Sequence, residues 1–311
     1  MPFAVGGNSR IRTNIPAENA YNALDISNRD ISLRQLRLST GKRINNAGDD
    51  VAGYITSRAL QTRNGSLKSA LLIIGDAQNT SNILMDSLDN INEVISKLKD
   101  ATAQAASGAL GTDEKVALAK AAFRMAQQVQ TIVDSTVFAG SQLLDGTFSS
   151  TFIVGYNAGS TLLTIGIDMR ESNDDFNISS HMFNVNSVNN ENFAGVLGLN
   201  LMSLNDITAT DLGVFSTDMI GKTLSSLAEA INNSNKVAAY LGGISNRLQS
   251  QEDLLRNQIV NYNSAISRIE DADVAKEQLQ LIKSQFLQQA SLTSMAQANQ
   301  NPSAFLQLIQ G

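Results

Sequence analysis

The chain has 311 residues, of which 42% are hydrophobic and 17% are charged, and its formal net charge is −6. This length is enough for one large or two modest domains, and the acidic balance argues against nucleic-acid binding, which relies on basic surfaces. The absence of cysteine excludes disulfides and thiolate metal sites. No apolar run approaches the roughly eighteen residues of a membrane span.

The composition favours long helices. Aromatic residues make up only 5% of the chain and tryptophan is absent, so the core must consist of Leu, Ile, Val and Ala. The three prolines, Pro2, Pro16 and Pro302, all lie near the ends. Between Pro16 and Pro302, therefore, no residue is barred from a helix by a missing N–H group.

The first segment, residues 1–16, contains two prolines and is predicted to be irregular. It lacks the apolar stretch of a cleavable signal peptide. A helix is expected from Ala17, with Leu24, Ile31 and Leu38 at seven-residue intervals and mostly polar residues between them. Because most helical stability in proteins comes from packing, a seam this thin indicates that the helix needs a partner.

A break over residues 39–50, which contains Gly41 and Gly48, precedes the longest predicted helix. This helix begins near Val51, where Asp49 or Asp50 is a suitable N-cap, and continues to about residue 106. Its apolar residues step by four and three, which keeps them on one side of a helix. They are Leu84, Leu88, Ile91, Ile95 and Leu98. Such a seam must be covered by another element.

A short glycine-containing connection then predicts an antiparallel helical hairpin, whose second helix is capped by Thr112 or Asp113. From residue 140 to 217 the chain is rich in Asn, Ser, Thr and Gly. The segments 152–154 and 163–169 have the alternation of a β-hairpin. A further strand is expected around residues 197–201.

The helical period returns near residue 224 and extends to Ile269, where the acidic run 270–273 marks a boundary. A last helical segment follows, with an apolar tail at the C-terminus. The order of elements is therefore mirrored: weak helix, break, long helix, β-rich middle, long helix, break, weak helix. We predict a mainly α fold with a β-rich middle, a mirrored long-helix coiled-coil bundle with the N- and C-termini paired at one end.

Three parts are predicted from this layout. They are a terminal helical domain of residues 1–45 and 274–311, a long-helix bundle with the β-hairpin of residues 46–165 and 218–273, and a short β and loop segment of residues 166–217. The thin apolar seams of the terminal segments predict self-assembly, because a lone subunit leaves them unsatisfied.

Sequence motifs at both ends resemble one family. Residues 38–53 read LSTGKRINNAGDDVAG, which resembles the N-terminal signature of bacterial flagellins. Residues 267–273 read SRIEDAD, which resembles the flagellin C-terminal signature, and LQQA at 287–290 and MAQANQ at 295–300 follow in the family's order. The resemblance rests on four motifs in the right order at the right ends.

The resemblance covers roughly residues 15–165 and 220–310. It implies an extracellular structural subunit of the bacterial flagellum that is exported unfolded through the flagellar type III apparatus and polymerises into the filament. It also implies that the terminal segments form the inner filament layer and that the middle faces outward. The short middle implies a short form that lacks large outer domains. The implied partners are further copies of the chain, the export apparatus, an export chaperone, and filament cap and junction proteins, with no nucleic acid and no membrane.

Two sets of residues are predicted to hold the assembly together. Subunit packing in the terminal layer is assigned to Leu24, Ile31, Leu38, Ile282, Phe286, Leu306 and Ile309. The core of the rod is assigned to Leu84, Leu88, Ile91, Ile95, Leu98, Leu255, Ile259 and Tyr262.

No catalytic, cofactor or metal site is predicted, and the chain is not expected to be an enzyme. The sole histidine, His181, has no second histidine or cysteine to join it in a metal site, and an H-E-x-x-H motif is impossible. The nearest alternative function is a hook–filament junction protein, which shares the two-ended layout. A secreted coiled-coil adhesin that uses the β-rich middle is a further alternative and predicts ordered ends in a monomer or small oligomer.

The resemblance has one departure. Many flagellins are detected by an innate Toll-like receptor through charged residues on these helices. By resemblance the family's arginine, glutamate and second arginine fall at Lys97, Gln128 and Thr131. Lysine cannot reproduce the guanidinium fork, and Gln128 carries no charge, so weak receptor activation is expected.

Overall fold

The computed structural model describes residues 13–156, 162–178, 183–189 and 192–310, without the side chains of Tyr156 and of residues 301–310. The chain forms two compact units, one of residues 1–65 and 260–311 and the other of residues 66–259. We call them the terminal unit and the central unit. The two longest helices contribute to both units, and each unit is described by itself.

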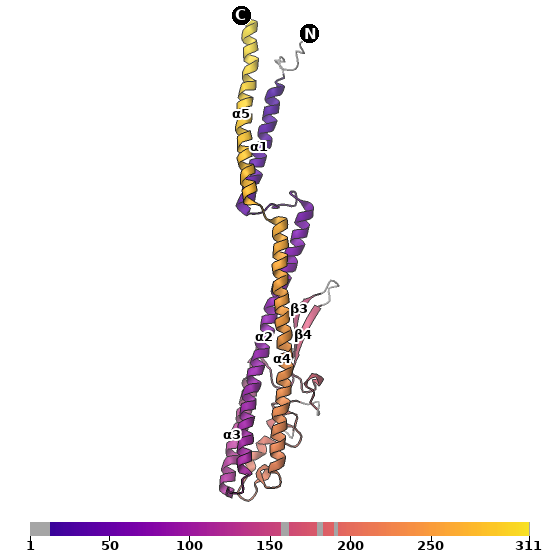
Figure 1. Cartoon of the computed structure of the whole chain (residues 1–311), viewed down its shortest axis with the longest axis vertical. Coiled ribbons are helices and arrows are strands. Elements are labelled where there is room, and N and C mark those ends of the chain that lie inside the picture. Colours follow the sequence, from indigo (N-terminus) through magenta and orange to yellow (C-terminus); the bar gives the residue numbers. More distant parts are fainter. Residues whose placement is uncertain (1–12, 157–161, 179–182, 190–191, 311) are drawn as a thin grey trace. The chain divides into compact units, whose positions relative to one another are not determined.

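The described part of the chain is mainly helical, with a small β-rich middle, as the sequence predicts (Figure 1). The long helices are α1 (Ile15–Thr40), α2 (Val51–Ala105), α3 (Thr112–Ser135), α4 (Ile220–Glu270) and α5 (Val274–Gln310). Two antiparallel strand pairs follow α3, namely β1 (Val137–Phe138) with β2 (Ser141–Gln142) and β3 (Ser149–Tyr156) with β4 (Leu162–Asp168). Between β4 and α4 the chain forms the short 3₁₀ helices η1 (Asp174–Phe176), η2 (Ser187–Asn189), η3 (Phe193–Gly195), η4 (Leu201–Asp206) and η5 (Gly213–Phe215).

The helix ends follow local chemistry. The backbone N–H of Gly53 donates to Asp50 Oδ1 at 2.9 Å, so Asp50 caps α2 as predicted. Gly41 ends α1 with φ +70°, a left-handed conformation that glycine adopts at low cost. The predicted cap of α3 was wrong, because Thr112 is already helical and the N-cap Gly111 offers no side chain.

In the terminal unit, α1 and α5 are antiparallel. Asn14 Nδ2 donates to the carbonyl of Ala298 at 2.8 Å, and Gln288 Nε2 donates to Asn28 Oδ1 at 2.6 Å. The start of α2 and the end of α4 also pair in an antiparallel arrangement, and Asn64 Nδ2 donates to Asn263 Oδ1 at 2.7 Å. First helix pairs with last, and second with second-to-last, as the mirrored sequence predicts.

The central unit contains the large core. Gln78 Nε2 donates to Glu252 Oε2 at 2.8 Å, which fixes α2 beside α4, and the apolar faces of both helices pack with α3, the β-hairpin and the 3₁₀ helices in one cluster. The predicted alternation of β4 is confirmed at Ile165, Ile167 and Met169, which are buried, but not at Leu163, which the same pattern placed on the buried face and which is exposed. The hydroxyl of Tyr240 on α4 accepts from the backbone N–H of Asp168 at 3.2 Å and so anchors the end of β4.

The middle of the chain differs from expectation at one predicted strand. The strand expected at residues 197–201 was wrong, because Gly195 and Gly198 have φ of +79° and +80° and interrupt any extended run. The segment 166–217 contributes Phe176, Phe193 and other side chains of at most 1% exposure to the core of the central unit. Its aromatic residues drive this burial.

The breaks of the chain fall close to the predicted boundaries. The connection between α1 and α2 spans residues 41–50, and α4 and α5 are separated at residues 271–273. The boundaries of the two compact units lie instead inside α2, between Gly65 and Ser66, and inside α4, between Ile259 and Val260.

Candidate assembly surface

The seam between α1 and α5 contains small and polar residues. Ala20, Ser27, Ser284 and Ala298 are buried there, and Ile44, in the loop after α1, is the only large apolar side chain buried in the terminal unit among those that the structure describes. Apolar burial contributes about 25 cal/mol per Å², so a seam of this kind stabilises the helix pair weakly. The described part of the terminal unit therefore lacks a large apolar core.

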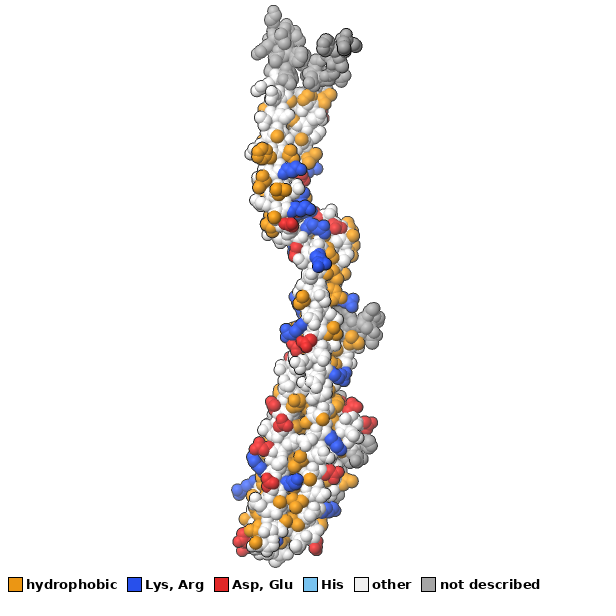
Figure 2. All heavy atoms as spheres, viewed as in Figure 1, with side chains coloured by type: hydrophobic (Ala, Val, Ile, Leu, Met, Phe, Trp, Pro, Cys, Tyr) orange, Lys and Arg blue, Asp and Glu red, His pale blue; other side chains and the backbone are white. Residues whose placement is uncertain are grey.

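The large apolar side chains of this pair lie on its surface instead (Figure 2). On α5, Leu279, Ile282 and Phe286 are exposed to 66%, 52% and 73%. Their spacing of three and four residues places them on one face of the helix. We call these three residues the α5 stripe. A contiguous apolar patch indicates an interaction site, whereas a single exposed residue does not.

The predicted terminal residues divide into three groups. Ile282 and Phe286 are exposed, whereas Leu24, Ile31 and Leu38 on α1 are half-buried. Leu306 and Ile309 lie in the last turns of α5, where the side chains are outside the described part. A single chain thus leaves the α5 stripe uncovered by α1. Sequence analysis missed Tyr21 and Ile26, both 61% exposed, because they fall outside the seven-residue pattern.

The residues predicted for the rod have two environments. Six of them are at most 2% exposed in the core of the central unit: Leu84, Leu88, Ile91, Ile95, Leu98 and Leu255. Ile259 and Tyr262 are half-buried. The reason is that the described core ends at Ala70 on α2 and at Leu255 on α4, so beyond these residues no described element adds a third layer to the helix pair.

A cluster of polar contacts joins the loop after α1 to the end of α4 within the terminal unit. Glu270, whose side chain is 5% exposed, pairs with Lys42 Nζ at 2.6 Å and accepts from Gln61 Nε2. The backbone N–H of Arg43 donates to the carbonyl of Glu270 at 2.6 Å, and its guanidinium donates to the carbonyl of Ile269 at 2.7 Å. The loop thus satisfies carbonyls that a helix C-terminus leaves free. We call Lys42, Arg43, Gln61, Ile269 and Glu270 the junction latch.

A second buried carboxylate lies at the start of α5. Glu277 accepts from Arg34 at 2.8 Å and from Arg37 at 3.5 Å, and its side chain is 9% exposed. These bonds set the register of α1 against α5, since a buried charge must be paired.

The loop between α1 and α2 has its own carboxylate. The backbone N–H groups of Asn46 and Asn45 donate to Asp49 and hold the pKa of this carboxyl below its usual range. The depressed pKa means that the charged form stabilises the fold above the ordinary aspartate pKa, and that this stabilisation is lost as the pH falls through the folded-state pKa. The loop is therefore expected to loosen in acid.

The described residues contain no group of three His, Cys, Asp or Glu side chains placed to hold a metal ion. His181 lies outside the described residues. No helix in the described part combines the length and apolarity that a membrane span requires.

These features define a class: a two-ended helical protein whose paired terminal helices present an exposed apolar face. Two family models match the chain, the bacterial flagellin N-terminal helical region at residues 11–149 and the C-terminal helical region at residues 224–309. The chain belongs to the bacterial flagellin family, in a short form without a large outer domain, and is a structural subunit of the flagellar filament.

Curated relatives match along almost their whole length. A flagellin of Bacillus subtilis is 29% identical over 308 residues and one of Halalkalibacterium halodurans is 27% identical over 300 residues, each covering 96% of this chain and 99% of the relative. A solved structure of a putative flagellar hook-associated protein from Vibrio parahaemolyticus has the same fold, with a TM-score of 0.56 at 13% identity over 72% of this chain and 100% of that one.

Proposed function

We propose that the terminal unit is the assembly module of this filament subunit. In this proposal α1 and α5 form the inner layer, the paired α2 and α4 with the β-hairpin form the next, and residues 166–217 lie toward the outside. The observation that supports it is the α5 stripe, three large apolar side chains on one face that the described part of the chain leaves exposed.

The mechanism is coupled ordering and polymerisation. The α1–α5 pair buries little apolar surface alone, so ordering its backbone, at about 1–2 kcal/mol per residue, is poorly offset in a lone subunit. Full burial of a Phe or Leu side chain contributes about 1.5–3 kcal/mol. Covering the stripe with neighbouring copies supplies the missing stabilisation, and the filament thus stabilises the fold of its own subunits.

The remaining partners follow from family membership. We infer that the chain reaches the outside of the cell unfolded, through the flagellar type III export apparatus with an export chaperone, and that it meets cap and junction proteins at the filament ends. We also infer that it has no catalytic activity. The shared fold with a hook-associated protein does not favour the junction alternative, because the curated relatives with full-length matches are flagellins.

The test replaces Phe286, the most exposed residue of the α5 stripe. The variant Phe286→Ser should raise the critical concentration for seeded polymerisation about tenfold or more, because 1.4 kcal/mol corresponds to a factor of ten. The matched control is Leu197→Ser, which removes a side chain of 71% exposure from the central unit. Sedimentation of filaments at a series of protein concentrations gives the critical concentration. An unchanged value for Phe286→Ser would contradict the proposal.

A second prediction concerns innate recognition. Lys97, Gln128 and Thr131 are all exposed, and Lys97 Nζ is paired with Glu93 at 2.7 Å. We expect the chain to activate the Toll-like receptor weakly in a reporter-cell assay, and the triple variant Lys97→Arg, Gln128→Glu, Thr131→Arg to activate it more strongly. Full potency of the unmodified chain would show that these three positions do not limit recognition.

A further inference from the structure

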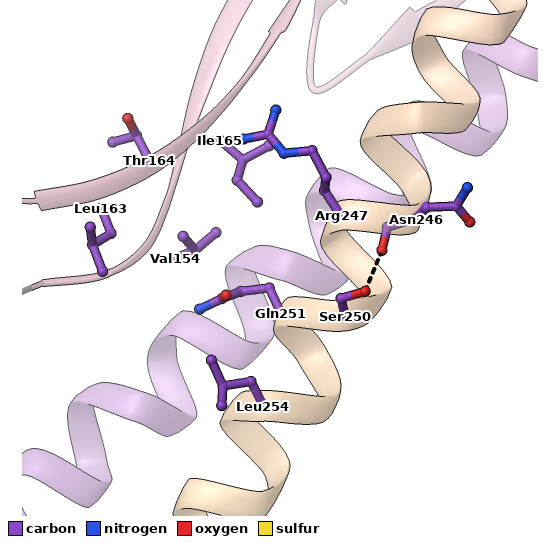
Figure 3. A pocket seen from close by; sticks show the side chains of 9 residues that line it. All are labelled: Val154, Leu163, Thr164, Ile165, Asn246, Arg247, Ser250, Gln251 and Leu254. Atoms are coloured by element: carbon purple, nitrogen blue, oxygen red, sulfur yellow. Dashed lines mark hydrogen bonds between the residues drawn. The ribbon is translucent and has the colours of Figure 1, made fainter.

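The central unit contains a groove between the β-hairpin and α4, with a cavity of about 590 Å³ (Figure 3). Val154, Leu163 and Ile165 form its hairpin wall, and Leu254 with the polar side chains Asn246, Ser250 and Gln251 forms its α4 wall. Leu163 and Leu254 are 47% and 48% exposed. The groove therefore offers an apolar lining that nothing in the described part of the chain covers.

The positively charged side chain of Arg247 lies at the edge of this groove. The Arg247 side chain is exposed and lines the cavity (Figure 3). It makes no ion pair with any residue that the structure describes, whereas Arg256, further along α4, is held by Glu252 at 2.6 Å. A free guanidinium beside an apolar lining fits a partner that presents a carboxylate next to an apolar side chain.

The outer face of α2 presents such a pair. Leu72 is 74% exposed, the largest value among the exposed large apolar side chains that the structure describes, and Asp76 follows one helical turn later. Residues four apart are neighbours on a helix surface. The flanking Ala70, Ile74 and Ala77 are buried, so the pair points away from the core. Asp76 makes no ion pair within the described part of the chain.

Leu72 and Asp76 on α2 lie close to the groove along the length of the paired helices α2 and α4. The hydrogen bond from Gln78 to Glu252 joins α2 just after Asp76 to α4 between Ser250 and Leu254. Leu72 and Asp76 are exposed on α2 and do not line the groove, which lies between the β-hairpin and α4. A contact between two different surfaces of identical subunits is heterologous, so it adds further copies rather than closing a dimer.

We propose that the groove receives the outer face of α2 from a second copy of the chain, with Leu72 between Leu163 and Leu254 and the Asp76 carboxylate against the Arg247 guanidinium. This inference rests on the proposed function, because it assigns one contact between neighbouring subunits in the filament. It adds a specific pairing in the central unit to the apolar contact of the terminal unit.

Charge reversal tests the pairing directly. Arg247→Glu and Asp76→Arg should each raise the critical concentration by about tenfold, since each places like charges in contact. An equimolar mixture of the two variants should assemble near the unmodified concentration, because every groove can then meet an opposite charge on its neighbour. The control is Arg124→Glu, which makes the same charge change at an exposed site on α3.

The outcomes separate this inference from the proposed function. If Arg247→Glu and Asp76→Arg both assemble as the unmodified chain does, the groove pairing is overturned, while the Phe286→Ser result still decides the role of the terminal unit. If each variant is impaired but the mixture is not rescued, the two residues do not meet and the pairing is likewise overturned. The thermal unfolding midpoint of each variant, followed by circular dichroism, shows whether its fold is intact.

Discussion

Removal of residues 290–311 should leave a soluble, helical protein that does not polymerise. The truncation takes away the C-terminal part of α5, including Ala298, which is buried against α1 and accepts from Asn14. The N-terminal part of α1 then has no partner. The core of the central unit extends only from Ala70 on α2 to Leu255 on α4, so its cooperative unfolding should be unchanged.

Electron microscopy and sedimentation, with and without seeds of the full-length chain, measure the result. The truncated chain should neither form filaments nor lengthen seeds, even at concentrations about a hundredfold above the full-length critical concentration. The central unit provides the internal control, because its thermal transition should match that of the full-length monomer. Normal filaments from the truncated chain would show that the terminal pair is not the assembly module.

The sequence predicts the architecture well because long apolar repeats with steps of three and four residues indicate helices with one buried face. The four- and three-residue steps from Leu84 to Leu98 indicate one buried face, and the structure buries all of it. The mirrored order of helices indicates the pairing of α1 with α5 and of α2 with α4. Motifs at both ends then add a family that periodicity alone does not specify.

The sequence predicts less where the structure depends on contacts distant in the chain. The seam of α1 and α5 uses Ala20, Ser27 and Ser284, small residues that carry no strong periodic signal. The segment 166–217 is rich in polar residues, and its aromatic side chains are buried because they join the core cluster of the central unit, where Phe176 packs against Tyr240 of α4. Glu270 marks a boundary in the sequence, but its partners Lys42 and Gln61 are more than two hundred residues away.

The second prediction with a large expected effect concerns the Glu270 carboxylate and the stability of the terminal unit. Replacing Glu270 by alanine should weaken the terminal unit by about 1.5–3 kcal/mol, the contribution of a hydrogen bond to a charged group, because Lys42 and Gln61 lose their acceptor. The lower part of this range is expected, since Lys42 is 43% exposed and solvent replaces part of its lost partner. The critical concentration for assembly should rise about tenfold.

The position of the effect is as informative as its size. In amide hydrogen exchange on filaments, protection should fall in α1 and at the end of α4, because the latch joins the loop after α1 to the carbonyls of Ile269 and Glu270. Protection in α2 around Leu88 and Ile91 should not change. The control Glu93→Ala breaks an exposed pair with Lys97 and should alter neither measurement, since exposed pairs contribute little.

The variant Glu270→Gln is a milder change than Glu270→Ala. It keeps one oxygen that accepts from Gln61 or Lys42, but it replaces the other oxygen by an NH2 group and removes the negative charge, so it should lie between the unmodified chain and Glu270→Ala. If both variants assemble at the unmodified concentration with unchanged exchange in α1, the latch does not stabilise the terminal unit. The α5 stripe would then have to supply that stabilisation alone, and Phe286→Ser would be the more damaging substitution.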